Sequence, residues 1–151
     1  MKQFDWKGVM PAITTQFDKN GVLDLKAFRN NLSNQIKAGV NGIILGGTLG
    51  EASTLKDLEK KELLATTLDE VNGKIPVIMN IAEQATSKAV DLAKQLESEG
   101  ADGLMLLPPM RYKANDQETV AYFSSVASST SLPIMIYNNP VDYKIEVTLD
   151  M

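Results

Sequence analysis

Two residue types are missing from this sequence, cysteine and histidine. Without cysteine, the chain forms neither disulfides nor thiolate metal sites. Without histidine, it has no Ser-His-Asp triad, no His-ligated zinc and no histidine general base. Acid–base chemistry must therefore use tyrosine, lysine, carboxylates or bound water. We expect neither a bound metal nor a cofactor.

Positive charge and long apolar runs are also scarce. The formal net charge of the 151 residues is −4, and lysine and arginine form no basic run, which argues against nucleic-acid and acidic-membrane partners. No apolar run approaches the length of a membrane span, and residues 1–11 lack the apolar core of a signal peptide. We expect a cytoplasmic protein of one domain whose partner is a small molecule.

Five short apolar runs are predicted to be strands. They are apolar along nearly their whole length, as strands buried on both faces are. The predicted strands are Gly8–Thr14, Gly42–Leu45, Pro76–Asn80, Gly103–Leu107 and Pro133–Tyr137.

Between these runs, apolar residues recur at helical spacing and predict four helices. The apolar positions are Leu25, Phe28, Leu32 and Ile36; Leu64, Leu68 and Val71; Val90, Ala93 and Leu96; and Val120 and Phe123, the last two facing inward. Asn72-Gly73 is the expected stop of the second helix, Thr86 the N-cap of the third, and Asp116 the start of the fourth.

An internal repeat supports this alternation. Residues 39–45 resemble residues 100–106, and residues 75–79 resemble residues 132–136. Repeated βα units with parallel strands fit either a barrel or a doubly wound open sheet. Periodicity alone leaves both architectures open.

The strand ends favour the barrel. A flavin-binding open sheet needs a Ser/Thr/Gly-rich phosphate loop after its first strand, and residues 16–21 lack one. A phospho-acceptor sheet needs carboxylates where this chain has Thr14, Thr15 and Asn80. We therefore predict a (β/α)8 TIM barrel. Since a complete barrel takes about 250 residues, residues 1–151 would be the N-terminal part of one such domain, with about the first five strands and four helices. Residues 148–151 resemble the start of another helix.

Active sites of barrels lie at the carboxyl ends of the strands. There, Gly46–Gly50 forms a glycine-rich turn whose backbone N–H groups suit a small carboxylate, and Thr48 adds a hydroxyl. Tyr137 is a candidate proton relay and Arg111 a candidate carboxylate clamp. Each has a plainer alternative: a tight βα loop, an amphipathic packing tyrosine and a solvated arginine.

Taken together, these segments resemble the dihydrodipicolinate synthase / N-acetylneuraminate lyase family over essentially the whole chain. The segments that carry the resemblance are residues 8–17, Gly21, Asp24, residues 47–51, residues 100–103, Pro108-Pro109 and residues 137–140.

The resemblance implies Schiff-base chemistry on pyruvate or a related 2-oxo acid. A lysine on the sixth strand, beyond the end of this chain, would attack the keto group, and Tyr137 would relay protons. Gly47, Thr48 and the Leu49 backbone would bind the substrate carboxylate. The resemblance also implies a homo-oligomer, a dimer or tetramer, at full length.

Two departures from the family pattern are informative. Leu49 stands where dihydrodipicolinate synthases usually have a second hydroxyl residue. Met110 and Arg111 stand where they usually have a tyrosine pair, one of which reaches into a neighbouring subunit. The sequence therefore looks more like deaminases of hydroxyproline breakdown, or like lyases and dehydratases of sugar acids. The other alternative is a non-catalytic fragment that keeps only the carboxylate site.

Overall fold

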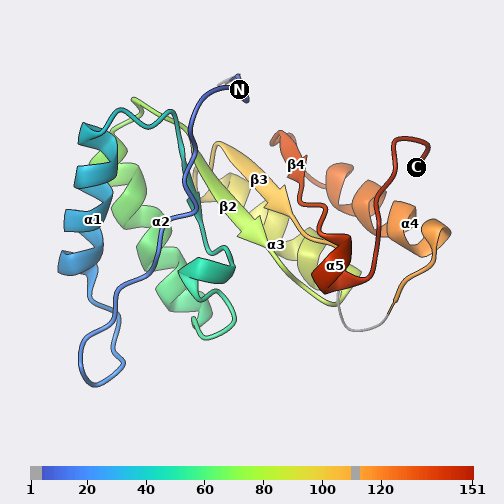
Figure 1. The fold of residues 1–151 in the computed structure, drawn as a ribbon, viewed down its shortest axis with the longest axis horizontal. Coiled ribbons are helices and arrows are strands. Elements are labelled where there is room, and N and C mark those ends of the chain that lie inside the picture. The colour runs from blue at the N-terminus through green and yellow to red at the C-terminus, as the bar shows by residue number, and fades with distance from the viewer. Residues whose placement is uncertain (1–4, 110–112) are drawn as a thin grey trace.

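The computed structural model describes residues 5–109 and 113–151, and its centre is a sheet of four parallel strands. The strands are β1 (Ile43–Leu45), β2 (Val77–Ile81), β3 (Gly103–Leu106) and β4 (Ile134–Ile136) (Figure 1). Their order in the sheet is their order in the chain, and every neighbouring pair is parallel. Each connection therefore joins two strands that are neighbours in the sheet.

The first predicted strand, Gly8–Thr14, runs beside β1 but is not one of the four strands. It makes a single parallel bridge, Ala12 with Ile44. The backbone N–H groups of Ile13 and Ile44 donate to the carbonyls of Ile44 and Pro11, both at 3.0 Å. The segment thus continues the parallel order at the edge of β1.

Helices occupy the stretches between the strands. They are α1 (Leu25–Lys37), the short 3-10 helix η1 (Thr48–Gly50), α2 (Asp57–Val71), α3 (Thr86–Ser98), α4 (Asp116–Ala127) and α5 (Pro140–Tyr143). Asp24 caps α1 by accepting a hydrogen bond from the Ala27 N–H. As predicted, α2 ends at Asn72, which takes the left-handed conformation with φ of 46°.

Two local helix predictions were wrong. Thr86 is the first residue of α3 and not its N-cap; Ala85 holds that place and makes no side-chain cap. In α4, Val120 is 37% exposed and does not face inward. The buried positions are Thr119, Tyr122 and Val126.

A capping box begins α4. Asn115 accepts from the Glu118 N–H at 2.9 Å, and the Glu118 carboxylate accepts from the Asn115 N–H at the same distance. This capping box begins the helix at Asp116, as predicted. The helical repeat places Tyr122 on the buried face with Thr119 and Val126, and Val120 on the opposite side.

The two faces of the sheet are packed differently, which decides between the two architectures. One face joins the helices in a large apolar core, to which Ile43 and Leu45 of β1 contribute. The other face carries a small cluster, which we call the inner-face cluster: Ile44, Ile78, Met105 and Leu107, with Met10, Ala82, Met135 and Tyr143 packed against it. None of its members comes from α1 to α4. An open doubly wound sheet has helices on both faces, so the single covered face and the sequential strand order confirm part of a (β/α)8 barrel.

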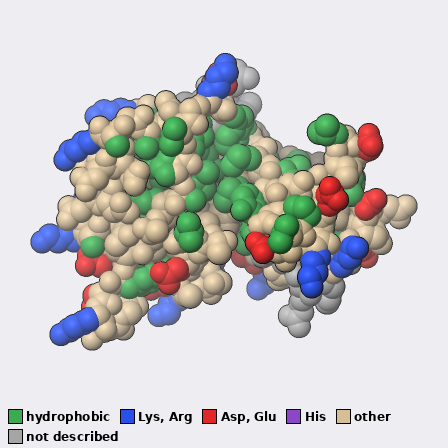
Figure 2. All heavy atoms as spheres, in the orientation of Figure 1, with side chains coloured by type: hydrophobic (Ala, Val, Ile, Leu, Met, Phe, Trp, Pro, Cys, Tyr) green, Lys and Arg blue, Asp and Glu red, His purple; other side chains and the backbone are tan. Residues whose placement is uncertain are grey.

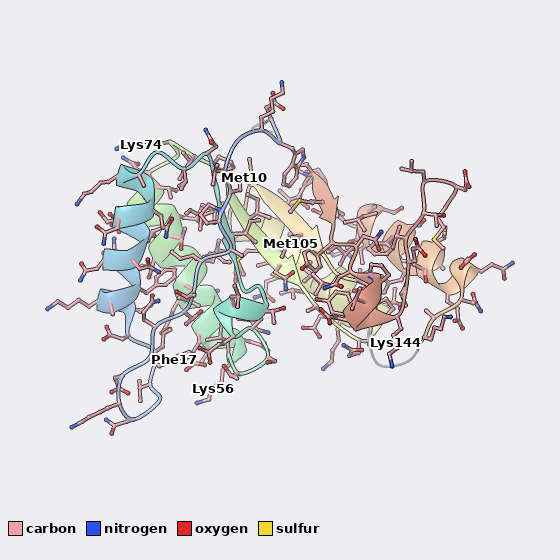
Figure 3. The ribbon with its side chains drawn as sticks, in the orientation of Figure 1. Met10, Phe17, Lys56, Lys74, Met105 and Lys144 are labelled. Carbon is pink, nitrogen blue, oxygen red and sulfur yellow. The ribbon has the colours of Figure 1, made fainter. Side chains whose placement is uncertain are left out.

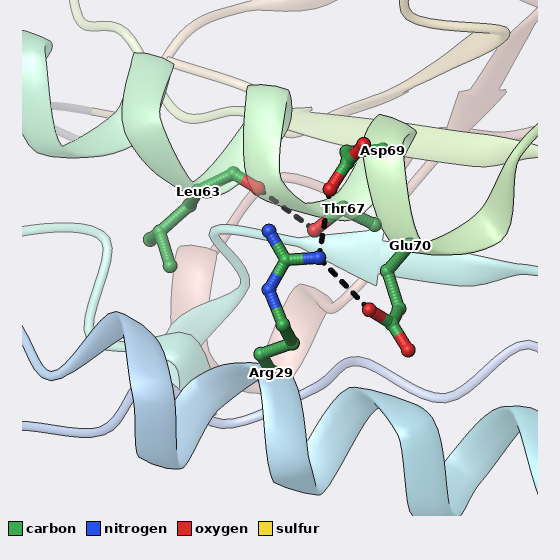
Figure 4. Close-up of polar contacts among 5 residues, drawn as sticks. All are labelled: Arg29, Leu63, Thr67, Asp69 and Glu70. Atoms are coloured by element: carbon green, nitrogen blue, oxygen red, sulfur yellow. Dashed lines mark hydrogen bonds and ion pairs between the residues drawn. The ribbon is translucent and has the colours of Figure 1, made fainter.

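Neighbouring helices are also linked by charge. The Arg29 guanidinium of α1 lies 2.8 Å from the Asp69 carboxylate and 2.9 Å from that of Glu70, both on α2 (Figure 4). Exposed pairs of this kind add little stability, so the buried apolar contacts hold α1 against α2.

Residues 148–151 were predicted to begin a helix, and no membrane span was expected. Leu149 and Asp150 form a turn, so the expected helix start at residues 148–151 is not a helix here. No helix within residues 5–109 and 113–151 is long and apolar enough to cross a membrane.

Candidate active site

The glycine-rich turn after β1 is the most constrained part of the site. Gly46 has a φ of +66°, a conformation that glycine adopts without strain. At Gly50, an added Cβ would lie 3.1 Å from the Ile13 carbonyl oxygen, so the turn and the first extended segment approach closely. Within the turn, the Gly50 and Glu51 N–H groups donate to the carbonyls of Gly47 and Thr48 at 3.0 and 3.1 Å.

Two buried side chains hold this turn from either side. The Thr15 hydroxyl donates to the Gly50 carbonyl at 2.6 Å, and the Asn80 amide donates to the Gly46 carbonyl at 2.8 Å. The Asn80 side-chain oxygen is buried and has no partner among the described residues. Sequence analysis placed Asn80 at a strand end but gave it no role; its role is to fix the turn.

A cavity of about 500 Å³ opens on the face of the sheet that carries the inner-face cluster. Its wall is apolar along the strands, where Met10 and Met105 contribute side chains (Figure 3). Hydrophobic side chains gather over the middle of the molecule in Figure 2, where Figure 1 draws the sheet. The polar part of the wall comes from the turn after β1, the loop after β4 and Asn80 of β2.

Two tyrosines follow β4 and line this cavity. Tyr137 donates its backbone N–H to the Leu106 carbonyl at 3.0 Å, and its side chain is 40% exposed. Its ring centroid lies 6.0 Å from that of Tyr143, with 56° between the ring planes. Burial raises the pKa of Tyr143, while a side-chain hydrogen bond with Thr48 acts in the opposite direction.

The structure brings together four of the five predicted site residues. Gly47, Thr48, Leu49 and Tyr137 all line the one cavity. Arg111 lies outside the described residues.

Tyr143 was missed by sequence analysis. Asn139 caps the short helix that carries Tyr143, and Pro140 is the first residue of that helix. A second tyrosine in the same strand-end loop as Tyr137 was the available signal.

Other charged residues near the strand ends lie elsewhere. Glu51 is exposed, and Glu83 lines a separate groove beside α3. Lys144 caps the end of α5 and is not among the cavity-lining residues (Figure 3). Within residues 5–109 and 113–151, no cluster of three acidic side chains could hold a metal ion.

These features define a class of protein. Parallel segments follow one another in chain order, helices cover one face, and hydroxyl groups gather at the carboxyl ends of the strands. This is the layout of a (β/α)-barrel enzyme, in which loops after the strands build the site.

The chain belongs to the dihydrodipicolinate synthetase family, whose model matches residues 5–150. It is 37% identical over 149 residues to the 4-hydroxy-tetrahydrodipicolinate synthase of Bartonella quintana, an alignment that covers 96% of this chain and 51% of that protein. The chain spans about half the length of the curated relatives it matches.

Solved structures agree in fold. The 4-hydroxy-tetrahydrodipicolinate synthase of Methylacidiphilum fumariolicum superposes with a TM-score of 0.92 at 34% identity, over 97% of this chain and 48% of that one. The family member YagE of E. coli, solved in complex with pyruvate, superposes with a TM-score of 0.88 at 30% identity, over 95% and 48%.

Proposed function

We propose that the full-length protein containing these residues is a lyase or synthase that forms a Schiff base with pyruvate or a related 2-oxo acid. The observation that carries the proposal is the shared cavity of Gly47, Thr48, Leu49 and Tyr137 at the ends of β1 and β4. A cavity of about 500 Å³ suits a small substrate. Membership of the family and the pyruvate complex of YagE support the same assignment.

The turn after β1 is the proposed carboxylate site. The N–H groups of Thr48 and Leu49 precede the first hydrogen bond inside η1, which the Gly50 N–H makes. N–H groups at such a position attract anions. The 2-oxo acid carboxylate would lie on these two N–H groups and on the Thr48 hydroxyl.

Imine formation then needs an amine and a proton relay. The lysine amine adds to the keto carbon, and the former keto oxygen leaves as water once it has gained two protons. Tyr137 would pass protons to that oxygen. No lysine is among the described residues that line the cavity, so we assign the nucleophile to a part of the polypeptide outside residues 1–151.

Leu49 bears on which reaction of the family is catalysed. Its side chain is 71% exposed and lines the cavity, so it presents methyl groups to the substrate. This favours a second candidate function, a deaminase or dehydratase of hydroxyproline or sugar-acid breakdown, over an enzyme of lysine biosynthesis. A homo-oligomer, dimer or tetramer, in the cytoplasm completes the proposal.

Borohydride reduction in the presence of pyruvate tests the proposal. The wild-type full-length protein should gain one fixed mass on one lysine, and Thr48→Val should slow the labelling. Thr86→Val is the matched control, because Thr86 is exposed at the start of α3, away from the cavity. No adduct with several 2-oxo acids would instead support a non-catalytic binding protein.

A further inference from the structure

We propose that Tyr143 is a positioning residue of this site, which holds the Thr48 hydroxyl and the Tyr137 ring in one arrangement across the cavity. The inference rests on the proposed function and deepens it.

The short helix α5 fixes where Tyr143 lies. Asn139 caps this helix by accepting from the Asp142 N–H at 3.3 Å, and Pro140 occupies its first position. The Tyr143 N–H donates to the Asn139 carbonyl at 3.0 Å. Lys144 then takes a left-handed conformation that ends the helix. The backbone of Tyr143 is therefore set by local structure, and its side chain turns onto the inner-face cluster.

From that place, Tyr143 connects two distant parts of the sheet. β2 and β3 separate β1 from β4, so the turn after β1 and the loop after β4 are not neighbours in the sheet. The Tyr143 ring packs at a tilt against Tyr137. Tyr143 and Thr48 line the same cavity, where the Thr48 side chain acts to lower the pKa of the Tyr143 hydroxyl. Tyr143 is thus the link between the proposed carboxylate site and the proposed proton relay.

The chemistry of a phenol suits this task. Burial raises the pKa of Tyr143, so the hydroxyl stays protonated near neutral pH. A neutral hydroxyl can both donate and accept a hydrogen bond. It can therefore orient the Thr48 hydroxyl without placing a negative charge beside a bound carboxylate.

Single-turnover labelling of the full-length protein separates this role from simple packing. The rate of pyruvate imine formation is measured by borohydride quench for wild type and for Tyr143→Phe, which keeps the ring and loses the hydroxyl. Loss of the hydroxyl that orients Thr48 should slow the rate about tenfold, with little change in the pyruvate concentration giving half the maximal rate. Tyr122→Phe is the matched control, because it removes a phenol that donates to the Glu83 carbonyl at 3.1 Å, away from the cavity.

Coupling to Thr48 provides the second readout. If Tyr143 acts through Thr48, then adding Tyr143→Phe to Thr48→Val should slow the reaction no further. Thermal melting of each variant shows whether the fold is kept. Tyr143→Leu, which also loses the ring contact with Tyr137, should be slower than Tyr143→Phe.

The outcomes are distinguishable. A wild-type protein that traps no 2-oxo acid contradicts the proposed function and this inference together. A wild-type protein that traps pyruvate, with Tyr143→Phe reacting at the same rate, overturns the inference alone. Rate losses that multiply in the Thr48→Val double variant also overturn it, since they would show that the two residues act independently.

Discussion

Asn80 offers a test of how the turn after β1 is held, through the substitution Asn80→Asp. Its amide donates to the Gly46 carbonyl at 2.8 Å, and the side chain is only 9% exposed. A carboxylate cannot donate, so the substitution leaves that carbonyl unpaired and places a charge beside it. Losing the bond and burying the charge should together lower the free energy of unfolding by roughly 2–4 kcal/mol at pH 8.

The same substitution predicts a particular pH dependence. Burial should raise the pKa of the introduced carboxyl above that of the unfolded chain. A group whose pKa is raised in the folded state contributes most to the free energy of unfolding at low pH, and this contribution is lost as pH rises. The protonated carboxyl can also donate its O–H to the Gly46 carbonyl. The stability difference from wild type should therefore shrink between pH 8 and pH 5.

Urea unfolding of the full-length protein at both pH values measures this difference. Asn41→Asp is the matched control, because Asn41 accepts from the Val9 N–H at an exposed site, at 2.8 Å, and a carboxylate accepts equally well. That variant should resemble wild type at both pH values. An Asn80→Asp protein as stable as wild type at pH 8, or a deficit that grows on acidification, would refute the reasoning.

Four other predictions follow from the sequence and the structure. Arg111→Ala should raise the Michaelis constant for the true substrate more than about tenfold, since an Arg–carboxylate contact contributes roughly 1.5–3 kcal/mol to binding. An unchanged Michaelis constant would mark Arg111 as a solvated loop residue. Dihydrodipicolinate synthase activity with aspartate semialdehyde should be weak and should rise when Leu49→Thr is combined with Arg111→Tyr; a wild-type rate equal to that of a dedicated synthase contradicts this. Hydrogen bonds from Ser131 and Thr130 lower the pKa of Glu97, so the ionised carboxylate stabilises the fold above its unfolded pKa and this stabilisation is lost as pH falls. The melting temperature of Glu97→Gln should therefore lie below that of wild type at pH 7 and approach it in acid. A difference in melting temperature that stays constant with pH would contradict this. Residues 1–151 expressed alone should not trap pyruvate, and a monomeric, cooperatively melting piece that does so would overturn that expectation.

Much of the fold followed from local pattern. The helical spacing of Phe28 and Leu32 placed α1, because both side chains are fully buried against the sheet. The strands β1, β2 and β3, in which every residue is buried, were found for the same reason, whereas β4 is partly exposed. Val120 of α4 shows the limit, since the apolar pattern of this helix is weak and did not distinguish Val120 from the buried Tyr122, whereas Phe123 packs against the core as predicted.

The site was predictable only in part. Thr48 and Tyr137 could be found because each lies within three residues after an apolar strand, and parallel strands bring their ends to one edge. The roles of Asn80 and Tyr143 could not be found in this way. Each depends on a contact between segments far apart in the chain, Asn80 with Gly46 and Tyr143 with Thr48, and such contacts exist only once the chain has folded.

The most direct test of the central claim is the location of the reduced pyruvate adduct in the full-length protein. After borohydride reduction, the protein is digested and the modified peptide is identified by mass spectrometry. The account predicts one modified lysine, outside residues 1–151, with labelling that slows in Tyr137→Phe and Thr48→Val. An adduct on a lysine within residues 1–151, such as Lys144, or no adduct on any lysine, would contradict it.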